Sequence, residues 1–271
     1  MKAEPTMRAS KKIYRLADMT GGAFAQAACE NPVILLPLGS YEDHGPHLPM
    51  GDYVLADMLA ARIAQGASLA GVQTYVAPCL PFGVADYFGS SPGGTALAPQ
   101  SFRLVLEDMI QALLRHGLRK IILLNGHGGN VPVIHEVSLK IRQQKNLVIP
   151  SFYLWKVARQ IMEAQLGAGH SARFGHGAEP LLSLSMALRG DDVTAGTPTR
   201  AVPGTLLGLA VADFGVLDFE GVGVEAPVEF SEVARPAIAT AWPLANATLG
   251  IQVSEALVAL AVKFIIHFVQ V

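Results

Sequence analysis

The feature that most limits how this chain can fold is the alternation of short apolar runs with stretches of helical periodicity. Strand-like apolar runs occur at residues 33–38, 74–77, 120–125 and 147–153. Runs of this length that are separated by helical patterns are typical of parallel strands joined by crossover helices. We therefore expect an α/β fold with a mainly parallel central sheet.

Apolar residues recur at helical spacing between these runs. We predict helices over residues 52–66 and 101–116, after Asn130, and from Glu179 to Leu188. Asp52 falls in the first turn of one helix and Asn130 precedes another, so either side chain can cap exposed backbone N–H groups. Residues 191–243 show no clear periodicity, and we expect loops and short strands there that could cover a site.

Composition places the chain among globular proteins. Of its 271 residues, 51% are hydrophobic and 15% are charged, so the chain can bury a sizeable core. We expect one domain over residues 1–271. The formal net charge of -2 gives no electrostatic footprint for nucleic acid or for an anionic membrane surface, and neither partner is expected.

We expect neither a secretory signal in the first residues nor a membrane span in the last ones. Residues 1–12 are polar and lead into no long apolar stretch, which predicts a cytoplasmic location. Polar residues interrupt the apolar segment 254–271 before it reaches the roughly 18 residues of a membrane span. That segment indicates a helix buried in the core or packed against a partner subunit. Cys29 and Cys79 form no CxxC motif, so we expect small core residues rather than a disulfide.

Three potential metal ligands lie directly after the first apolar run. Glu42, His44 and Asp52 belong to the segment GSYEDHGPHLPMGD. Imidazole nitrogen suits zinc, copper, iron and nickel, whereas carboxylate oxygen also admits manganese and magnesium. This combination predicts a divalent metal site with hydrolytic rather than redox chemistry. The alternative is that His44 and His47 satisfy the backbone of a turn, with Glu42 and Asp43 solvated.

Two further His-Gly loops strengthen the interpretation as a metal site. His127 lies in NGHGGN, directly after the apolar run at 120–125, and His176 and Glu179 lie in FGHGAE. Open α/β sheets bind ligands at the carboxyl ends of their strands. The three loops can therefore converge on one site.

Two other motifs fit their usual functions less well. GHGGNV resembles a dinucleotide-binding loop, but Val131 stands where that fingerprint needs Gly or Ala. Residues 89–93 match the G-x-S-x-G nucleophile elbow around Ser91. The segment before Ser91 is no convincing buried strand, and no helical pattern follows it. A serine hydrolase that uses Ser91 is therefore kept only as an alternative of a different chemical class.

The segments EDHGPHLPMGD, SPGGTAL, HGLRKIILLNGHGGN and GHGAE occur in this order between about Pro32 and Leu188, and AWPLANATLG follows near the C-terminus. Taken jointly they resemble the creatininase (creatinine amidohydrolase) family. The resemblance implies a three-layer α/β sandwich and a homo-oligomer, often a hexamer. It also implies two divalent ions, zinc or manganese with iron as a further option, that hydrolyse C–N bonds of amides.

The resemblance implies specific roles for residues of this chain. The five metal ligands of the family correspond here to Glu42 and His127 on one ion, His44 and Glu179 on the other, and Asp52 as the bridge between the two ions. His176 falls where the family has a catalytic histidine, and Glu179 is counted with it as catalytic. A hydroxide shared by the two ions would attack the carbonyl carbon, and His176 would pass a proton to the leaving nitrogen.

Departures from the family pattern concern the substrate. Creatinine-hydrolysing members tend to place an aromatic residue and a Glu after the NGH histidine, where this chain has Gly128 and Gly129. A tryptophan that they carry before the later His-Gly pair is absent from residues 172–175, and a second Glu is replaced by Leu181. We therefore expect a wider pocket that accepts a small linear or cyclic amide other than creatinine.

Two aromatic residues are candidates for the substrate-binding walls. Trp155 matches a family position, and Phe174 lies just before the later His-Gly pair. Both could pack against a planar substrate. The alternative for Trp155 is an ordinary half-buried tryptophan. For the whole chain, the alternative to an amidohydrolase is an inactive metal-binding or sensing protein on the same fold.

Overall fold

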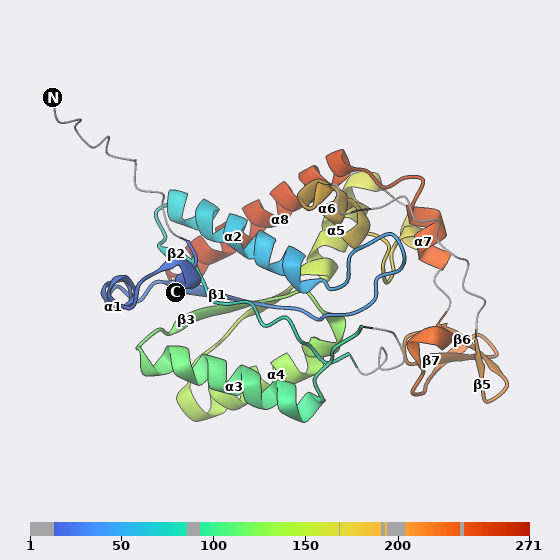
Figure 1. Cartoon of the computed structure of the whole chain (residues 1–271), viewed down its shortest axis with the longest axis horizontal. Coiled ribbons are helices and arrows are strands. Elements are labelled where there is room, and N and C mark those ends of the chain that lie inside the picture. The colour runs from blue at the N-terminus through green and yellow to red at the C-terminus, as the bar shows by residue number, and fades with distance from the viewer. Residues whose placement is uncertain (1–13, 86–92, 168, 191–192, 194–203, 234–235) are drawn as a thin grey trace.

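A central parallel sheet carries helices on both faces (Figure 1). The computed structural model describes residues 14–85, 93–167, 169–190, 193, 204–233 and 236–271. The sheet has the strand order β2-β1-β3-β4, and its members are β1 (Val33–Leu38), β2 (Thr74–Val76), β3 (Lys120–Asn125) and β4 (Ser151–Tyr153). All of its pairings are parallel. This sheet confirms the expected α/β class.

Two helical layers enclose the sheet, as Figure 1 shows. One face is covered by α2 (Tyr53–Leu69), α5 (Leu154–Leu166), α6 (Leu181–Leu188) and α8 (Ala247–Phe268). The other is covered by α3 (Pro99–Arg115) and α4 (Val131–Lys145), and α1 (Gly21–Ala28) packs at its margin. The arrangement is the three-layer sandwich that was expected.

The central strand β1 shows why the core is divided into two layers. All six of its residues are buried. Val33 and Leu35 join the apolar cluster on one face, while Ile34, Leu36 and Leu38 join the cluster on the other. Successive side chains of a strand point to opposite faces, so a continuously apolar strand serves both helical layers.

The predicted elements are present, with differences at their ends. The fourth strand begins at Ser151 rather than at 147, because Pro150 has no N–H to donate to a neighbouring strand. Asp52 and Asn130 stand at the N-caps of α2 and α4, but neither side chain makes a capping hydrogen bond. The expectation that they cap helices was therefore wrong, since both are used by the site described below.

A second, antiparallel sheet is formed by the region in which loops and short strands were expected. Its strands are β5 (Thr205–Leu206), β6 (Leu209–Asp213), β7 (Val216–Phe219) and β8 (Val222–Glu225), in that order. A separate small core holds it together, consisting of Val211, Leu217, Val228 and Val233. The short elements η6 (Phe230–Glu232) and α7 (Pro236–Ala241) follow. Ser91 lies outside the described residues.

The C-terminal helix α8 packs along the face formed by α2, α5 and α6 (Figure 1). Its length and its mean hydropathy of 1.9 would suffice to cross a membrane. One face of α8 nevertheless lies in the core, where Val253, Leu257, Ala261 and Ile265 are buried. A helix with one face buried in the core is confirmed, and packing against a partner subunit stays a prediction. The two cysteines differ from expectation, because Cys29 is exposed and Cys79 is only half-buried.

Candidate metal centre

Two loops meet at the carboxyl edge of the parallel sheet because the strands that precede them are neighbours. β1 and β3 are paired over their full length, and Leu38 is aligned with Asn125. The loop after β1 carries Glu42, His44 and Asp52, and the loop after β3 carries His127. The register thus places side chains more than 70 residues apart in the sequence at the same edge.

The first group of side chains joins Glu42, Asp52 and His127, which are all buried. Nδ1 of His127 lies 3.0 Å from Oε2 of Glu42 and 3.4 Å from Oδ2 of Asp52. One nitrogen and one oxygen from each of two carboxylates therefore face a common point. Within the described residues, these atoms lie within 4.8 Å of one another and could hold a metal ion.

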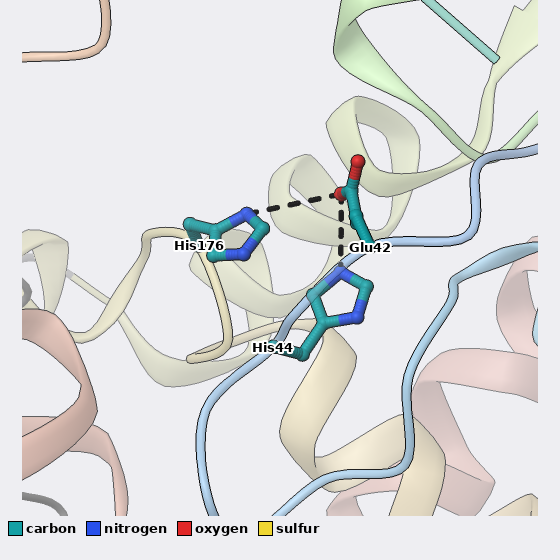
Figure 2. A group of neighbouring side chains, drawn as sticks. All are labelled: Glu42, His44 and His176. Carbon is teal, nitrogen blue, oxygen red and sulfur yellow. Dashed lines mark ion pairs between the residues drawn. The ribbon is translucent and has the colours of Figure 1, made fainter. Parts of the chain in front are cut away.

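The second group joins Glu42, His44 and His176 (Figure 2). Oε1 of Glu42 lies 3.3 Å from Nε2 of His44 and 3.9 Å from Nδ1 of His176. The two imidazole rings are stacked, with 4.7 Å between their centroids. Glu42 belongs to both groups and directs a different oxygen at each.

Backbone carbonyls orient two of these imidazoles. Nε2 of His127 lies 2.8 Å from the Val84 carbonyl oxygen, and Nε2 of His176 lies 2.5 Å from that of Asp43. A carbonyl oxygen can only accept a hydrogen bond, so Nε2 of each ring carries the proton. When each imidazole is neutral, its Nδ1 lone pair therefore faces Glu42. Metal-binding histidines are commonly oriented in this way.

A buried asparagine network holds the loops in place. Asn130 accepts a hydrogen bond from the Val84 N–H and donates to the Gly39 carbonyl and to Asn125 Oδ1. Asn125 in turn donates to the His127 carbonyl and accepts from the His127 N–H. Both amide side chains are buried. They connect the loop after β1, the segment at Val84 and the loop after β3.

Further contacts bring the third loop to the centre. His47 is buried, and its Nε2 lies 2.8 Å from the Gly177 carbonyl oxygen. Gly177 has φ of +67°, and a Cβ there would lie only 2.4 Å from the His44 carbonyl oxygen. Only glycine therefore fits at this close approach. The contact keeps His176 beside His44.

The protonation of the centre reflects its crowded charges. Burial alone would raise the pKa of Glu42, but the imidazoles of His127 and His44 outweigh it and hold the pKa well below its usual range. Burial raises the pKa of Asp52, which also lies beside the Glu42 carboxylate. The pKa of His127 is raised well above its usual value, since the carboxylates of Glu42 and Asp52 outweigh its burial. Burial and the neighbouring His44 lower the pKa of His176 to about 4.

The donor set fits a divalent metal ion. Neutral His127 and ionised Glu42 would present two lone pairs to each other at 3.0 Å, which is stable only with a proton or a cation between them. The raised pKa of His127 shows that a proton takes this place when no cation is bound. Imidazole nitrogen and carboxylate oxygen together suit zinc, manganese or iron. The two groups therefore provide places for two cations that share Glu42.

Glu179, a predicted ligand, belongs to neither group and bonds other partners. Its Oε1 lies 3.2 Å from Nη2 of the buried Arg173 and accepts a hydrogen bond of 2.6 Å from Ser183 Oγ. Its Oε2 accepts a hydrogen bond from the Ser183 N–H. Burial raises the pKa of Glu179 despite these partners. The ligand and catalytic roles of Glu179 stay predictions, and neither group of described donors includes it.

Of the two predicted substrate walls, only Trp155 contacts a loop of the centre among the described residues. Trp155 donates a hydrogen bond from Nε1 to the Gly126 carbonyl, next to His127, and is half-buried. Phe174 packs in the core layer of α2 and α8, with the Arg159 guanidinium 4.8 Å from its ring centroid. Their contact with a substrate stays a prediction.

Three aromatic residues near the centre were not found from the sequence. Phe214, in the turn between β6 and β7, and Phe230 lie 5.4 and 5.3 Å from the ring of His176. Tyr153 stands at the end of β4, where burial, followed by the carboxylates of Asp52 and Glu42, raises the pKa of its hydroxyl. The second sheet therefore reaches the centre through Phe214. Aromatic side chains mostly serve as packing groups, so these three could not be singled out without their tertiary contacts.

The wider pocket expected at Gly128 and Gly129 is wrong in part. A Cβ at Gly129 would lie 1.9 Å from the Val84 carbonyl oxygen, and one at Gly128 would lie 3.1 Å from the Tyr153 hydroxyl oxygen. Backbone and tyrosine occupy the space that the missing side chains would fill. The chain therefore cannot place a glutamate at 129 without moving the segment that contains Val84.

Comparison with known proteins agrees with this architecture. A family model described as creatininase, creatinine amidohydrolase, matches residues 17–265. A mutant creatininase complexed with creatine superposes with a TM-score of 0.72 and 22% identity, over 94% of this chain and 98% of that one. A manganese form of creatininase gives the same TM-score. These neighbours have the same fold.

Curated relatives differ in what they act on. The chain is 31% identical to creatinine amidohydrolase of Pseudomonas putida over 53% of its own length and 56% of that protein. It is 32% identical to mycofactocin precursor peptide peptidase of Mycolicibacterium smegmatis, over 38% of this chain and 42% of that protein. It is 29% identical to 3-dehydro-scyllo-inosose hydrolase of Thermotoga maritima, over 58% of this chain and 50% of that protein. The chain spans about half the length of the curated relatives it matches.

Proposed function

The chain belongs to the creatininase family, and from that premise we propose that it is a metal-dependent hydrolase that cleaves a C–N bond of a small amide. One observation carries the proposal. Glu42 directs one oxygen at His127 and the other at His44 and His176, so a single buried carboxylate serves two groups of donors. Shared carboxylates are typical of hydrolytic two-metal sites.

Two divalent ions, of zinc or manganese, are proposed for these groups. Glu42, Asp52 and His127 would hold one ion, and Glu42, His44 and His176 would hold the other. Divalent cations supply Lewis acidity, which polarises a carbonyl group and lowers the pKa of water towards about 7. Glu42 lies close to donors of both groups, whereas Asp52 belongs only to the first group, so Glu42 is favoured as the ligand that the two ions share.

The residues of the chain keep the centre ready for that chemistry. Val84 and Asp43 fix the tautomers of His127 and His176 through their carbonyl oxygens, so both rings present Nδ1 to the centre. Phe214 and Phe230 cover the ring of His176 and exclude water from that side. Preorganised, partly dry surroundings strengthen electrostatic interactions with a reacting carbonyl.

The substrate is proposed to be an amide other than creatinine. Gly128 and Gly129 provide neither the aromatic residue nor the Glu that creatinine-hydrolysing members tend to have, and the segment at Val84 closes off position 129. A site that loses groups that recognise its substrate can lose about 10⁴–10⁵-fold in specificity. Peptide amides enter the test because several relatives are peptide peptidases.

A substrate panel with controlled metal content tests the proposed function. The protein is stripped with a chelator, reloaded with zinc or manganese, and assayed on lactams, formamides, short peptides and creatinine. We expect hydrolysis of at least one amide only after reloading, with creatinine turned over poorly. Activity that survives complete removal of metal would contradict the proposal, and so would a reloaded protein that hydrolyses no amide.

A further inference from the structure

Tyr153 brings a hydroxyl group to the edge of the sheet at which the metal centre lies. It is the last residue of β4, where it is aligned with Asn125 at the end of β3. The loop that follows Asn125 contains His127 and Gly128. The Tyr153 hydroxyl reaches this loop, because a Cβ at Gly128 would lie 3.1 Å from its oxygen.

The hydroxyl is available for a ligand. No group among the described residues forms a hydrogen bond with it, and it is not one of the fully buried polar atoms that lack a partner. The ring itself is half-buried at the strand end. A phenol O–H that has no protein acceptor and is not fully enclosed can donate to a molecule in the site.

The surroundings keep this group protonated. Burial, followed by the charges of Asp52 and Glu42, raises the pKa of Tyr153 to about 12. The hydroxyl is therefore a neutral donor throughout the pH range in which the protein would work.

We propose that Tyr153 is a catalytic residue whose hydroxyl donates a hydrogen bond to the carbonyl oxygen of the amide substrate. The inference rests on the proposed function. As the amide carbon is attacked, negative charge develops on this oxygen, and a preorganised donor stabilises the transition state more than the bound substrate. The phenol keeps its proton throughout. The absence of a side chain at Gly128 leaves room for the hydroxyl.

Tyr153→Phe is the direct test, because it removes only the hydroxyl oxygen. With an amide hydrolysed by the metal-loaded wild type, we expect kcat to fall by about 10²–10³-fold, the usual loss of one such donor. KM and the metal content should change little. Tyr75→Phe is the matched control. Tyr75 lies on β2, at the opposite end of the sheet order, where its hydroxyl accepts a hydrogen bond from Gln73 Nε2, so the kinetics of this variant should equal those of the wild type.

Gly128→Ala tests the same hydroxyl from the other side. The added methyl group would crowd the Tyr153 oxygen at 3.1 Å and meets only Tyr153 within 4 Å, so we expect a partial loss of kcat with unchanged metal content. In the Tyr153→Phe background the methyl group should have little further effect, because coupled residues are not additive. Gly22→Ala, which meets nothing within 4 Å, is the control for a glycine substitution.

The outcomes separate this role from the proposed function. An active wild type with an equally active Tyr153→Phe variant would overturn the role of Tyr153 and leave the amidohydrolase intact. A fall in metal content that accounts for the lost activity would overturn it as well, since the hydroxyl would then act through the metal centre. A wild type that hydrolyses no amide would overturn both.

Discussion

The centre depends, residue by residue, on which nitrogen of each imidazole carries a proton. The carbonyls of Val84 and Asp43 bind the Nε2 protons of His127 and His176, which leaves Nδ1 of both rings for Glu42. Glu42 is then the acceptor common to two groups of donors. Its replacement should affect the whole centre, whereas its neighbours should affect only one half.

Metal content of single variants tests this division. Glu42→Gln should lower the occupancy of both ions, whereas Asp52→Asn should lower that of one. Elemental analysis after dialysis measures this directly. Glu136→Gln is the control, because Glu136 is exposed and pairs only with Arg103 in the described part of the chain. Two ions retained by Glu42→Gln would contradict the shared position.

His176→Ala distinguishes a ligand from a purely catalytic group. We expect the variant to bind about one ion fewer and to lose turnover, because Nδ1 of His176 is one of the donors of the second group. If His176 acts only as a general acid, as expected from the resemblance, turnover falls by about 10²–10⁴-fold while both ions remain. The same elemental analysis decides between the two roles.

Metal affinity should rise with pH. The pKa of His127 is raised well above its usual value in the metal-free protein, so the ring is protonated at neutral pH and must lose that proton to bind a cation. One displaced proton gives about a tenfold gain in affinity per pH unit below that pKa. Zinc titrations between pH 6 and 8 measure the slope. An affinity independent of pH would argue against His127 as a ligand.

The two cysteines should react at very different rates. Cys29 is exposed, whereas burial, followed by Asp57 and Asp52, raises the pKa of Cys79 to about 12. The thiolate is the nucleophile, so at pH 8 a thiol reagent should modify Cys29 and leave Cys79 intact. Mass spectrometry of the peptides measures this, and rapid modification of folded Cys79 would contradict it.

Among the structural elements, the site is held by the network of Asn130 rather than by any one strand. Asn130 joins three segments through buried hydrogen bonds. Asn130→Ala would leave buried groups without partners, and it should lower the free energy of unfolding by about 1–3 kcal/mol per unpaired group. Urea unfolding measures the loss. Gln143→Ala, an exposed change on α4, should stay within about 0.5 kcal/mol of the wild type.

Elements with a strong local pattern were predictable from the sequence. β1 and β3 have the bounds that their apolar runs indicate, and α3 ends before Gly117 as expected. Asp52 was predicted as a ligand, but its contact with the Ser40 N–H and the hydrogen bonds of Asn130 were not, because these contacts exist only after the loops meet. The pairing of Glu179 with Arg173 likewise leaves no signature in the local sequence.

On the scale of the whole molecule, the parallel sheet determines where the chemistry lies and the second sheet adds a cover. Neighbouring strands bring the loops after β1 and β3 together, and Phe214 carries the antiparallel sheet to His176. The convergence of the loops after β1 and β3 was predictable, because each loop directly follows an apolar run. The contact with the second sheet was not, because residues 204–233 have no periodicity that indicates their partner. The homo-oligomer and the cytoplasmic location stay predictions.

The measurement that tests the central claim most directly is a titration of metal-free protein with zinc or manganese, in which amide hydrolysis is recorded at each addition. Because two groups of donors share Glu42, we predict no activity before metal is added and a plateau of activity at about two metal ions per chain. Hydrolysis by the metal-free protein, or activity that does not respond to added metal, would contradict the assignment of a metal-dependent amidohydrolase.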